Sequence, residues 1–504
     1  PFSISNSGKT YLGGVNGSNS LPNRIVEDFV TAGGSAFANN YTGNGSWPIS
    51  SNKALSSATD IISNGLMTGG LRSGSGAISG SSMDALVSAG SAASNTAKTV
   101  APGILSLSGI YDSGSFQMSV YGSVDITNEQ TLAFQKQIGS NIWVPLDIPT
   151  HPDTEREEVI RQMEITFERM KEAKEIFGDD APISGPVQGA VFGDLREQAG
   201  RRVSEMGFTY CPVGAVVPLM EAYRYRELVD VIIDAKKGLS LGACVHLFGS
   251  GHPSMFALAV ACGCDIFDSA AYALYAKEGR YITPSGTLKL DEMSELPCAC
   301  PVCRSHTVEE LKKSPDKQKL LAYHNLAVTM AEISRVRAAV QDGTLFELVD
   351  ERCRSHPRLY DGYKRLLERI DEVAKFDRAS KRRFFYRGNE SCLRPEVSNY
   401  HKMIARITLG PEVLISAGGP EPSRFEEVID FKPPFGPLPY ELAETFPAGQ
   451  AEIPPTWDEY MVEYGIRGLK SLLDANPETK VTISTTPKWE AVFREAFPDA
   501  EVIV

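Results

Sequence analysis

From about Ile110 onward the chain alternates strand-like and helix-like segments, and this alternation limits the possible folds more than any other feature. Apolar runs read as strands: NIWVPLDIP, PISGPVQGA, GFTYCPVGA, ACVHLFGSG and CDIFDSAAY. Amphipathic runs such as PDTEREEVIRQMEITFERMKEAKEIFG and YRELVDVIIDAKKG lie between them and read as helices. The repeat of about 25–35 residues is typical of βα units around a parallel sheet. We therefore predict an α/β fold, and so many units in a row favour a (β/α)8 TIM barrel over an open sheet.

Composition divides the 504-residue chain into four predicted regions. Residues 1–110 are rich in Ser, Gly, Asn and Ala, with weak periodicity, and form an atypical segment expected to supply the first barrel strands. Residues 111–360 are the expected barrel, with an inserted zinc-binding subdomain at 295–330. Residues 361–430 are a basic helical region, and residues 431–504 are a Pro-rich connector followed by a small α/β unit ending in AEVIV.

Hydropathy, cysteine content and net charge disfavour several classes of protein. No apolar run of about 18 residues predicts a membrane span, and no signal peptide is visible at the start. Nine cysteines, an odd number, favour a reducing compartment, so we expect a cytoplasmic protein. The net charge of −13 disfavours nonspecific nucleic-acid binding. Residues 351–394 nevertheless hold 13 Lys/Arg against seven Asp/Glu, which is either a phosphate-facing surface or a solvated helix face.

A cysteine cluster predicts a metal site. Cys298, Cys300 and Cys303 lie in LPCACPVCR, and His324 follows in LLAYHNL. This C-x-C-x2-C…H pattern has the four ligands of a closed structural zinc site, which disfavours a zinc hydrolase with an open coordination position. His306 is the competing fourth ligand, but its spacing requires a very tight loop, so we prefer His324. The alternative is a set of reduced cysteines beside a surface histidine.

Polar residues and glycine at the ends of predicted strands suggest a common site. A buried carboxylate is costly unless it is hydrogen-bonded or used, although any single one is more often structural. In a barrel the carboxyl ends of all strands meet at one face, so several such residues are expected to converge there. The residues concerned are Asp112, Asp147, Gln188, Gly214, Phe248 and Asp268.

Long segments in this region resemble the archaeal tRNA-guanine transglycosylase family. They include DSGSFQMSVYGS, LDIPT, VVPLMEAYRYRELVD, HLFGSGHP, FALAVACGCDIFDSAAYALYAKEGRYITPSGT, LPCACPVC and VDERCRSHPRLYDGYKRLL. The resemblance implies a pentosyltransferase of archaeosine biosynthesis. It would exchange guanine at position 15 of the tRNA D-arm for 7-cyano-7-deazaguanine, and the target base must leave the tRNA core to react.

The resemblance also implies roles for individual residues. Asp268 matches the nucleophile that attacks C1′ of the nucleoside, and Asp112 matches the general acid/base. Two carboxylates suit an oxocarbenium-like transition state, as in retaining glycosidases. The implied substrate-binding residues are Asp147 and Gln188 at the base edge, the Gly214–Ala215 backbone, Ser113, and the stacking rings Phe116 and Phe248. The family usually has Gly-Gly where this chain has Gly214–Ala215.

The implied cofactor is one structural zinc ion, and the implied partners are tRNA and the purine-like base. The family tends to dimerise through the zinc region, so a homodimer is expected. No PUA module is recognisable, which predicts a separate PUA-domain protein as a further partner. The alternative function is a non-catalytic tRNA-binding homologue that pairs with an active transglycosylase, but such homologues typically lose some of Asp112, Asp147, Gln188 and Asp268.

Overall fold

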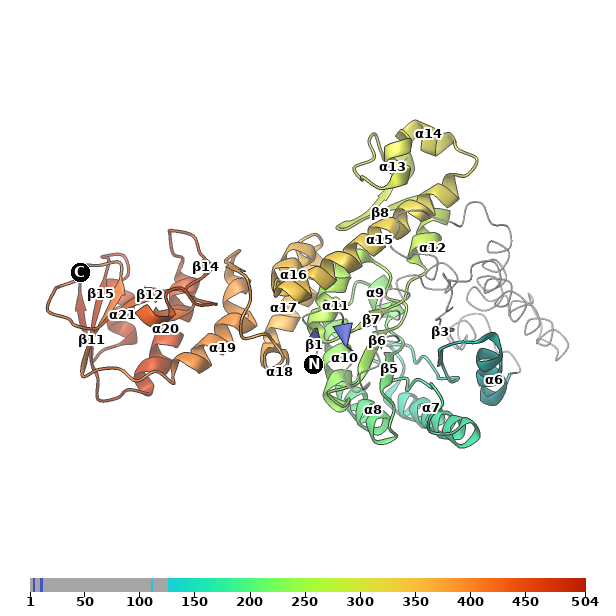
Figure 1. The fold of residues 1–504 in the computed structure, drawn as a ribbon, viewed down its shortest axis with the longest axis horizontal. Helices are drawn as coiled ribbons and strands as arrows, with labels where there is room; N and C mark the ends of the chain where they lie inside the picture. Colours follow the sequence, from blue (N-terminus) through green and yellow to red (C-terminus); the bar gives the residue numbers. More distant parts are fainter. Residues whose placement is uncertain (1–2, 5–9, 12–109, 112–125) are drawn as a thin grey trace. The chain divides into compact units, whose positions relative to one another are not determined.

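Short parallel strands form the centre of the first part of the chain in the computed structural model, which describes residues 3–4, 10–11, 110–111 and 126–504 (Figure 1). The chain divides into two units. The first comprises residues 1–336 and 352–362, and the second comprises residues 337–351 and 363–504. The boundaries that we predicted from composition stay predictions. The strands expected within residues 1–110 largely fall outside the described residues, apart from an antiparallel pair, β1 (Ser3–Ile4) with β2 (Thr10–Tyr11), and β3 (Ile110–Tyr111).

Neighbouring strands in the first unit follow chain order. β3 pairs in parallel with β4 (Ile142–Trp143), and residues 183–187 bridge β4 to β5 (Tyr210–Val213). β5 then pairs with β6 (Cys244–Leu247), and β6 pairs with β7 (Ile266–Phe267), again in parallel. This confirms the predicted α/β class. A doubly wound sheet reverses its strand order at a switch point, and the ladder formed by the described residues has no such reversal.

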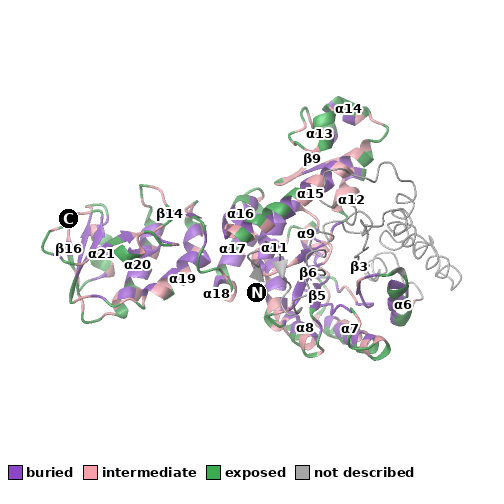
Figure 2. Ribbon diagram, viewed as in Figure 1, coloured by how far each residue is buried: buried purple, intermediate pink, exposed green. Residues whose placement is uncertain are grey.

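The residues of β4, β5, β6 and β7 are buried on both faces, as expected for parallel strands covered by helices (Figure 2). Side chains of one face form a single apolar cluster: Ile142, Val144, Tyr210, Cys244 and Ile266, with Phe248 packed against it. The residues between them along β5 and β6, such as Val213 and Val245, are also fully buried. The site at the strand ends therefore rests on a well-packed base.

Helices and one 3-10 turn connect the strands, and several of the helices form where caps and apolar periodicity predict them. They are α6 (Asn128–Ile138), α7 (Arg156–Phe177), α8 (Gly193–Glu205), α9 (Val217–Glu221), α10 (Tyr225–Gly238), the 3-10 turn η3 (Pro253–Met255), α11 (Phe256–Cys262) and α12 (Ala271–Lys277). Thr127 and Gln130 make a capping box at the start of α6, and Gly139 ends it in the left-handed conformation. α8 and α10 pack side by side through glycine, because a Cβ on Gly238 would lie 2.0 Å from the Glu197 carbonyl oxygen.

The cysteine-containing segment follows an antiparallel hairpin of β8 (Arg280–Thr283) and β9 (Gly286–Lys289). The 3-10 turn η4 (Leu290–Glu292), α13 (Pro301–Ser305) and α14 (Val308–Lys313) come next, followed by the long helix α15 (Lys317–Asp342). Apolar residues of the hairpin, α13, α14 and α15 share one small core that includes Tyr281, Leu311 and Leu321. α16 (Leu345–Cys353) and α17 (Pro357–Glu368) complete the predicted run of helices.

The second unit is built on a five-stranded sheet in the order β13-β12-β11-β15-β16. These strands are β13 (Gly436–Leu438), β12 (Val428–Lys432), β11 (Glu412–Ala417), β15 (Lys480–Thr485) and β16 (Glu501–Ile503), and β16 confirms the strand predicted in AEVIV. A separate parallel pair joins β10 (Phe384–Phe385) to β14 (Ala451–Glu452). The other elements are α18 (Ile370–Ala374), α19 (Pro395–Ile404), α20 (Glu459–Asp474), α21 (Glu490–Ala496) and the 3-10 turns η5 (Asn389–Leu393) and η6 (Tyr440–Leu442).

Several cations of the basic region 351–394 are used internally. In the second unit, buried Arg394 pairs with Glu347 at 2.8 Å and with Glu396 at 2.6 Å, and Lys381 lies 2.9 Å from Glu396. In the first unit, buried Arg352 pairs with Glu332 at 2.7 Å. These cations neutralise buried carboxylates, so part of the positive charge counted in the sequence is not available to phosphate groups.

Among the described residues, no helix is both long enough and apolar enough to cross a membrane.

Candidate active site and metal centre

Four of the residues predicted for the site lie in one row at the carboxyl ends of neighbouring strands. Val187 is paired with Val213, Val213 with Leu247, and Leu247 with Phe267. The next residue on each strand is therefore also in register, and these residues are Gln188, Gly214, Phe248 and Asp268. The parallel register thus brings them to the edge where α/β proteins place their active sites.

Asp147 and Gln188 form the first part of the site. Both side chains are buried, and Gln188 Nε2 donates a hydrogen bond to Asp147 Oδ2 at 2.6 Å. Within the described part of the chain, Gln188 Oε1 is buried without a hydrogen-bond partner. A buried acceptor without a partner is costly, so this amide is prepared to accept a hydrogen bond from a ligand.

Gly214 leaves room for the Gln188 side chain. A Cβ at this position would lie 2.2 Å from Gln188 Nε2, so any larger residue must displace the amide. The following residue, Ala215, has a φ of +61° and adopts the left-handed conformation that favours glycine. The departure from Gly-Gly noted in the sequence therefore places an alanine in a glycine-like conformation.

Arg196 supports this part of the site, and the sequence analysis missed it. Its guanidinium is fully buried and donates to three carbonyl oxygens: Ala190 at 2.8 Å, Val187 at 2.8 Å and Gly214 at 3.0 Å. Burial lowers the pKa of Arg196 to about 9, which still leaves it protonated at neutral pH. The guanidinium joins the ends of two neighbouring strands beside Gln188. The available signal was an arginine on the apolar face of α8 that also carries Ala199 and Val203.

Asp268 forms the second part of the site, together with two buried residues that the sequence analysis also missed. Its Oδ1 accepts a hydrogen bond from the Gly249 backbone N–H at 2.6 Å and lies 2.9 Å from His246 Nε2. His246 Nδ1 lies 2.8 Å from the Tyr210 hydroxyl. Asp268 is partly exposed, whereas Tyr210 and His246 are buried on the same face of β5 and β6. The ring edge of His246 also contacts Phe248, with centroids 4.6 Å apart.

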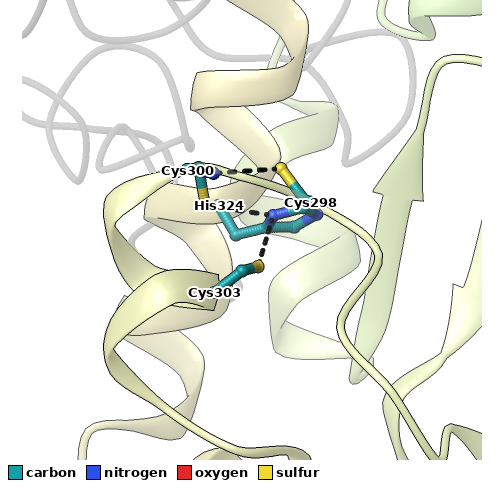
Figure 3. A group of neighbouring side chains, drawn as sticks. All are labelled: Cys298, Cys300, Cys303 and His324. Carbon is teal, nitrogen blue, oxygen red and sulfur yellow. Dashed lines mark hydrogen bonds between the residues drawn. The ribbon is translucent and has the colours of Figure 1, made fainter.

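The cysteine cluster gathers as the sequence predicts (Figure 3). The ligand atoms of Cys298, Cys300, Cys303 and His324 all lie within 4.8 Å of one another. His324 Nδ1 is 3.5 Å from Cys300 Sγ and 3.3 Å from Cys303 Sγ. Bond lengths of about 2.3 Å for Zn–S and about 2.0 Å for Zn–N imply separations of about 3.5–3.8 Å between tetrahedral ligand atoms. The donor set therefore fits one metal ion.

Surrounding contacts orient His324 for this role and exclude His306. His324 is fully buried, and its Nε2 donates to the Ile282 carbonyl oxygen at 2.9 Å, so Nδ1 carries the lone pair toward the thiols. Tyr281 stacks on the imidazole at a centroid distance of 3.6 Å. His306 Nδ1 instead bonds the Val302 carbonyl at 2.9 Å, outside the cluster. The structure therefore brings His324, and not His306, to the three cysteines.

The remaining predicted site residues, Asp112, Ser113 and Phe116, lie outside the described residues. Their predicted roles stay predictions.

Comparison with known proteins places these observations in a family. The family model described as queuine tRNA-ribosyltransferase matches residues 102–358. The chain is 49% identical to the tRNA-guanine(15) transglycosylase of Methanosarcina barkeri over 372 residues, covering 74% of this chain and 76% of that protein. It is 47% identical to the protein of the same name from Haloferax volcanii, covering 74% and 73%. Identity to that of Archaeoglobus fulgidus is 42%, covering 78% and 82%.

Proposed function

The chain belongs to the queuine tRNA-ribosyltransferase family of tRNA-guanine transglycosylases, and we propose from this premise that it exchanges guanine 15 of tRNA for 7-cyano-7-deazaguanine. Members of this family are pentosyltransferases, and relatives that are 42–49% identical to this chain over the aligned residues carry the name tRNA-guanine(15) transglycosylase. The observation that supports the proposal most is the row of Gln188, Gly214, Phe248 and Asp268, because it places a carboxylate in register with a base-binding amide.

We assign Asp268 as the nucleophile. Both hydrogen-bond donors contact Oδ1, so Oδ2 is the oxygen that attacks C1′ of nucleoside 15. The C1′–O bond forms as the bond from C1′ to guanine breaks, and guanine departs with the electron pair and a proton supplied by Asp112. The entering base then attacks C1′ through its ring nitrogen, gives its proton to Asp112 and releases the Asp268 carboxylate. Two displacements at C1′ retain the configuration of the sugar.

Asp147 and Gln188 are assigned to the edge of the base. A carboxylate accepts the N–H and amino protons of guanine or of its 7-deaza analogue, and Gln188 Oε1 offers a further acceptor. Phe248 lies between Gln188 and Asp268 in the row and is assigned to the face of the base. Four neighbouring strands span about 14 Å in a flat sheet, and less in a curved one, which is the scale of a nucleoside with its contacts.

The fold and metal assignments extend the same proposal. The strand ladder in chain order supports a closed (β/α)8 barrel. We assign one zinc ion to Cys298, Cys300, Cys303 and His324, where a closed four-ligand set would fix α13 against α15 and leave no position for substrate. None of the nine cysteines, all of which lie among the described residues, forms a disulfide, which supports a reducing, cytoplasmic location. A homodimer and a separate PUA-domain protein remain predicted partners.

Incorporation of labelled guanine into a tRNA transcript tests the proposed reaction. The expected result is incorporation into a transcript with guanine at position 15, its chase by 7-cyano-7-deazaguanine, and none in a transcript with adenine there. Tight tRNA binding without incorporation by folded, zinc-loaded protein would contradict this function and favour the non-catalytic homologue. Incorporation that appears only after adding a PUA-domain protein would support the partner prediction.

A further inference from the structure

We propose that His246, fixed by Tyr210, is a positioning residue that orients the carboxylate of Asp268. This inference rests on the proposed function, in which Asp268 is the nucleophile. The Tyr210 hydroxyl, both imidazole nitrogens and Asp268 Oδ1 form a continuous hydrogen-bonded series with separations of 2.8 and 2.9 Å. Only the aspartate end of the series is partly exposed, and the other two side chains are buried.

The distances determine which imidazole nitrogen faces the carboxylate with a proton. A lone pair on His246 Nε2 would repel Asp268 Oδ1 at 2.9 Å, so Nε2 must carry hydrogen in the neutral ring as well as in the charged ring. Burial raises the pKa of Tyr210 well above its usual value of 10, so its hydroxyl remains protonated. It can therefore donate to Nδ1 of the neutral ring, and this contact also fixes the plane of the imidazole.

Two hydrogen-bond donors to Oδ1 fix the orientation of the Asp268 carboxylate. The Gly249 N–H and His246 Nε2–H both bind Oδ1, which prevents rotation of the carboxylate and directs Oδ2 away from the strands. The same donors stabilise the negative charge that Asp268 regains when the entering base breaks the C1′–Oδ2 bond, and therefore assist its departure. Burying a tyrosine and a histidine in a core is costly unless their polar atoms form hydrogen bonds, and here both imidazole nitrogens of His246 do so.

Matched substitutions of His246 distinguish positioning of the Asp268 carboxylate from a contribution to packing alone. His246→Leu removes the donor. His246→Gln places an amide nitrogen near the position of Nε2, whereas His246→Asn places one nearer the backbone, at the Nδ1 position. Val245→Ala is the packing control, because Val245 is fully buried in the same strand and points to the opposite face. The readouts are kcat, KM for tRNA, the rate of covalent adduct formation in a single turnover, and the melting temperature.

The proposal predicts a fall of about 10- to 100-fold in kcat and in the rate of adduct formation for His246→Leu and His246→Asn, with KM for tRNA unchanged. His246→Gln should recover most of that loss. Tyr210→Phe should give a smaller loss of the same kind, and it serves as a second variant if His246→Leu fails to fold. Val245→Ala should lower the melting temperature and leave kcat unchanged.

Two results would overturn the inference. One is parental kcat in folded His246→Leu and His246→Asn while Asp268→Asn is inactive, which would leave the proposed function intact. The other is a loss of kcat that follows the melting temperature in all variants, including Val245→Ala, without recovery by His246→Gln. Activity in Asp268→Asn itself would instead refute the nucleophile assignment of the proposed function.

Discussion

Some residues of the site act through their contacts with other site residues, among them Gly214, Arg196 and His246. Of these three, only Gly214 was selected from the sequence. Asp147, Gln188, Gly214, Phe248 and Asp268 were selected because each follows a strand-like segment, and the parallel register brings four of them into one row. Arg196 was missed because its helix carries many other charged residues, whereas Tyr210 and His246 were missed because each lies inside an apolar segment. A polar residue in such a segment is usually read as a satisfied core residue, and only its partners reveal another role.

Gly214→Ala should weaken binding of the base. The added Cβ would lie 2.2 Å from Gln188 Nε2, so the amide must move and lose its hydrogen bond to Asp147. We expect KM for the base to rise about 10-fold or more, measured by steady-state guanine exchange. Ala215→Gly is the matched control, because it removes a Cβ from the next residue and relieves a φ of +61°. An unchanged KM in Gly214→Ala would contradict the assigned role of Gln188.

Arg196→Lys should destabilise the first unit despite keeping the charge. One ammonium group cannot reproduce the three bonds to the carbonyls of Val187, Ala190 and Gly214, so buried acceptors lose their partners. We expect a loss of about 2–5 kcal/mol in the free energy of unfolding, measured by chemical denaturation. Arg201→Lys on the same helix, where the arginine is exposed and paired with Glu197, should cost less than about 1 kcal/mol. Equal losses of unfolding free energy in Arg196→Lys and Arg201→Lys would contradict the stabilising role assigned to the three hydrogen bonds of Arg196.

At the scale of elements, helices were easier to predict than strands. Capping residues and apolar periodicity define α6 and α7 in the sequence, and both helices form there. Among the described residues, NIWVPLDIP, read as one strand, pairs only through Ile142 and Trp143. The backbone N–H and C=O of Val144 bond the Gln135 side chain instead, and Pro145 has no backbone N–H for the ladder. The spacing of the cysteines predicted the group of side chains that the structure brings together, because four ligands of one metal ion must converge on one point. The preference for His324 over His306 rested on the very tight loop that His306 would require.

His324→Ala should lower the metal content, whereas His306→Ala should leave it unchanged. His324 lies in the cluster with its Nδ1 toward two thiols, whereas His306 bonds a backbone carbonyl. We expect purified parent and His306→Ala to hold one zinc per chain by elemental analysis, and His324→Ala to bind it weakly. Adding a chelator to the parent should expose residues 298–324 to proteolysis, and any loss of turnover should follow from this local unfolding. Loss of turnover with this region still protected would instead indicate a catalytic metal.

At the scale of the whole molecule, the sequence indicated that a different region follows the cysteine-containing segment, but it did not indicate how the C-terminal residues fold. The Pro-rich connector predicted in 430–456 contains β13 and β14, and α20 follows it. β11 and β15 pair although more than 60 residues separate them in the sequence. Long-range pairing of this kind has no local signature. The acidic net charge likewise did not reveal that Arg394 and Lys381 neutralise buried carboxylates.

The buried Glu396 should make the stability of the second unit depend on pH. Burial opposes its ionisation, but the charges of Arg394 and Lys381 outweigh burial and lower its pKa from 4.5 to about 2. Because the folded pKa is below the unfolded one, its stabilisation is present above about pH 4.5 and is lost as pH falls toward 2. Glu396→Gln should cost about 3–5 kcal/mol near neutral pH, with the difference from the parent shrinking below pH 4.5.

Denaturation of both proteins across this pH range checks the prediction. Glu463→Gln is the control, because Glu463 forms an exposed pair with Arg467 on α20 and should change stability by less than about 1 kcal/mol at any pH. A difference between Glu396→Gln and the parent that stays constant with pH would refute the proposed linkage.

The most direct test of the central claim is to trap the covalent intermediate. The parent protein and Asp268→Asn would each be incubated with a tRNA transcript carrying guanine 15, denatured, and examined for a protein–RNA adduct by gel electrophoresis and peptide mapping. We predict an adduct with the parent, mapped to the peptide containing Asp268, and none with the folded variant. An adduct that persists in Asp268→Asn, or that maps to another carboxylate, would contradict the assignment of Asp268 as the nucleophile.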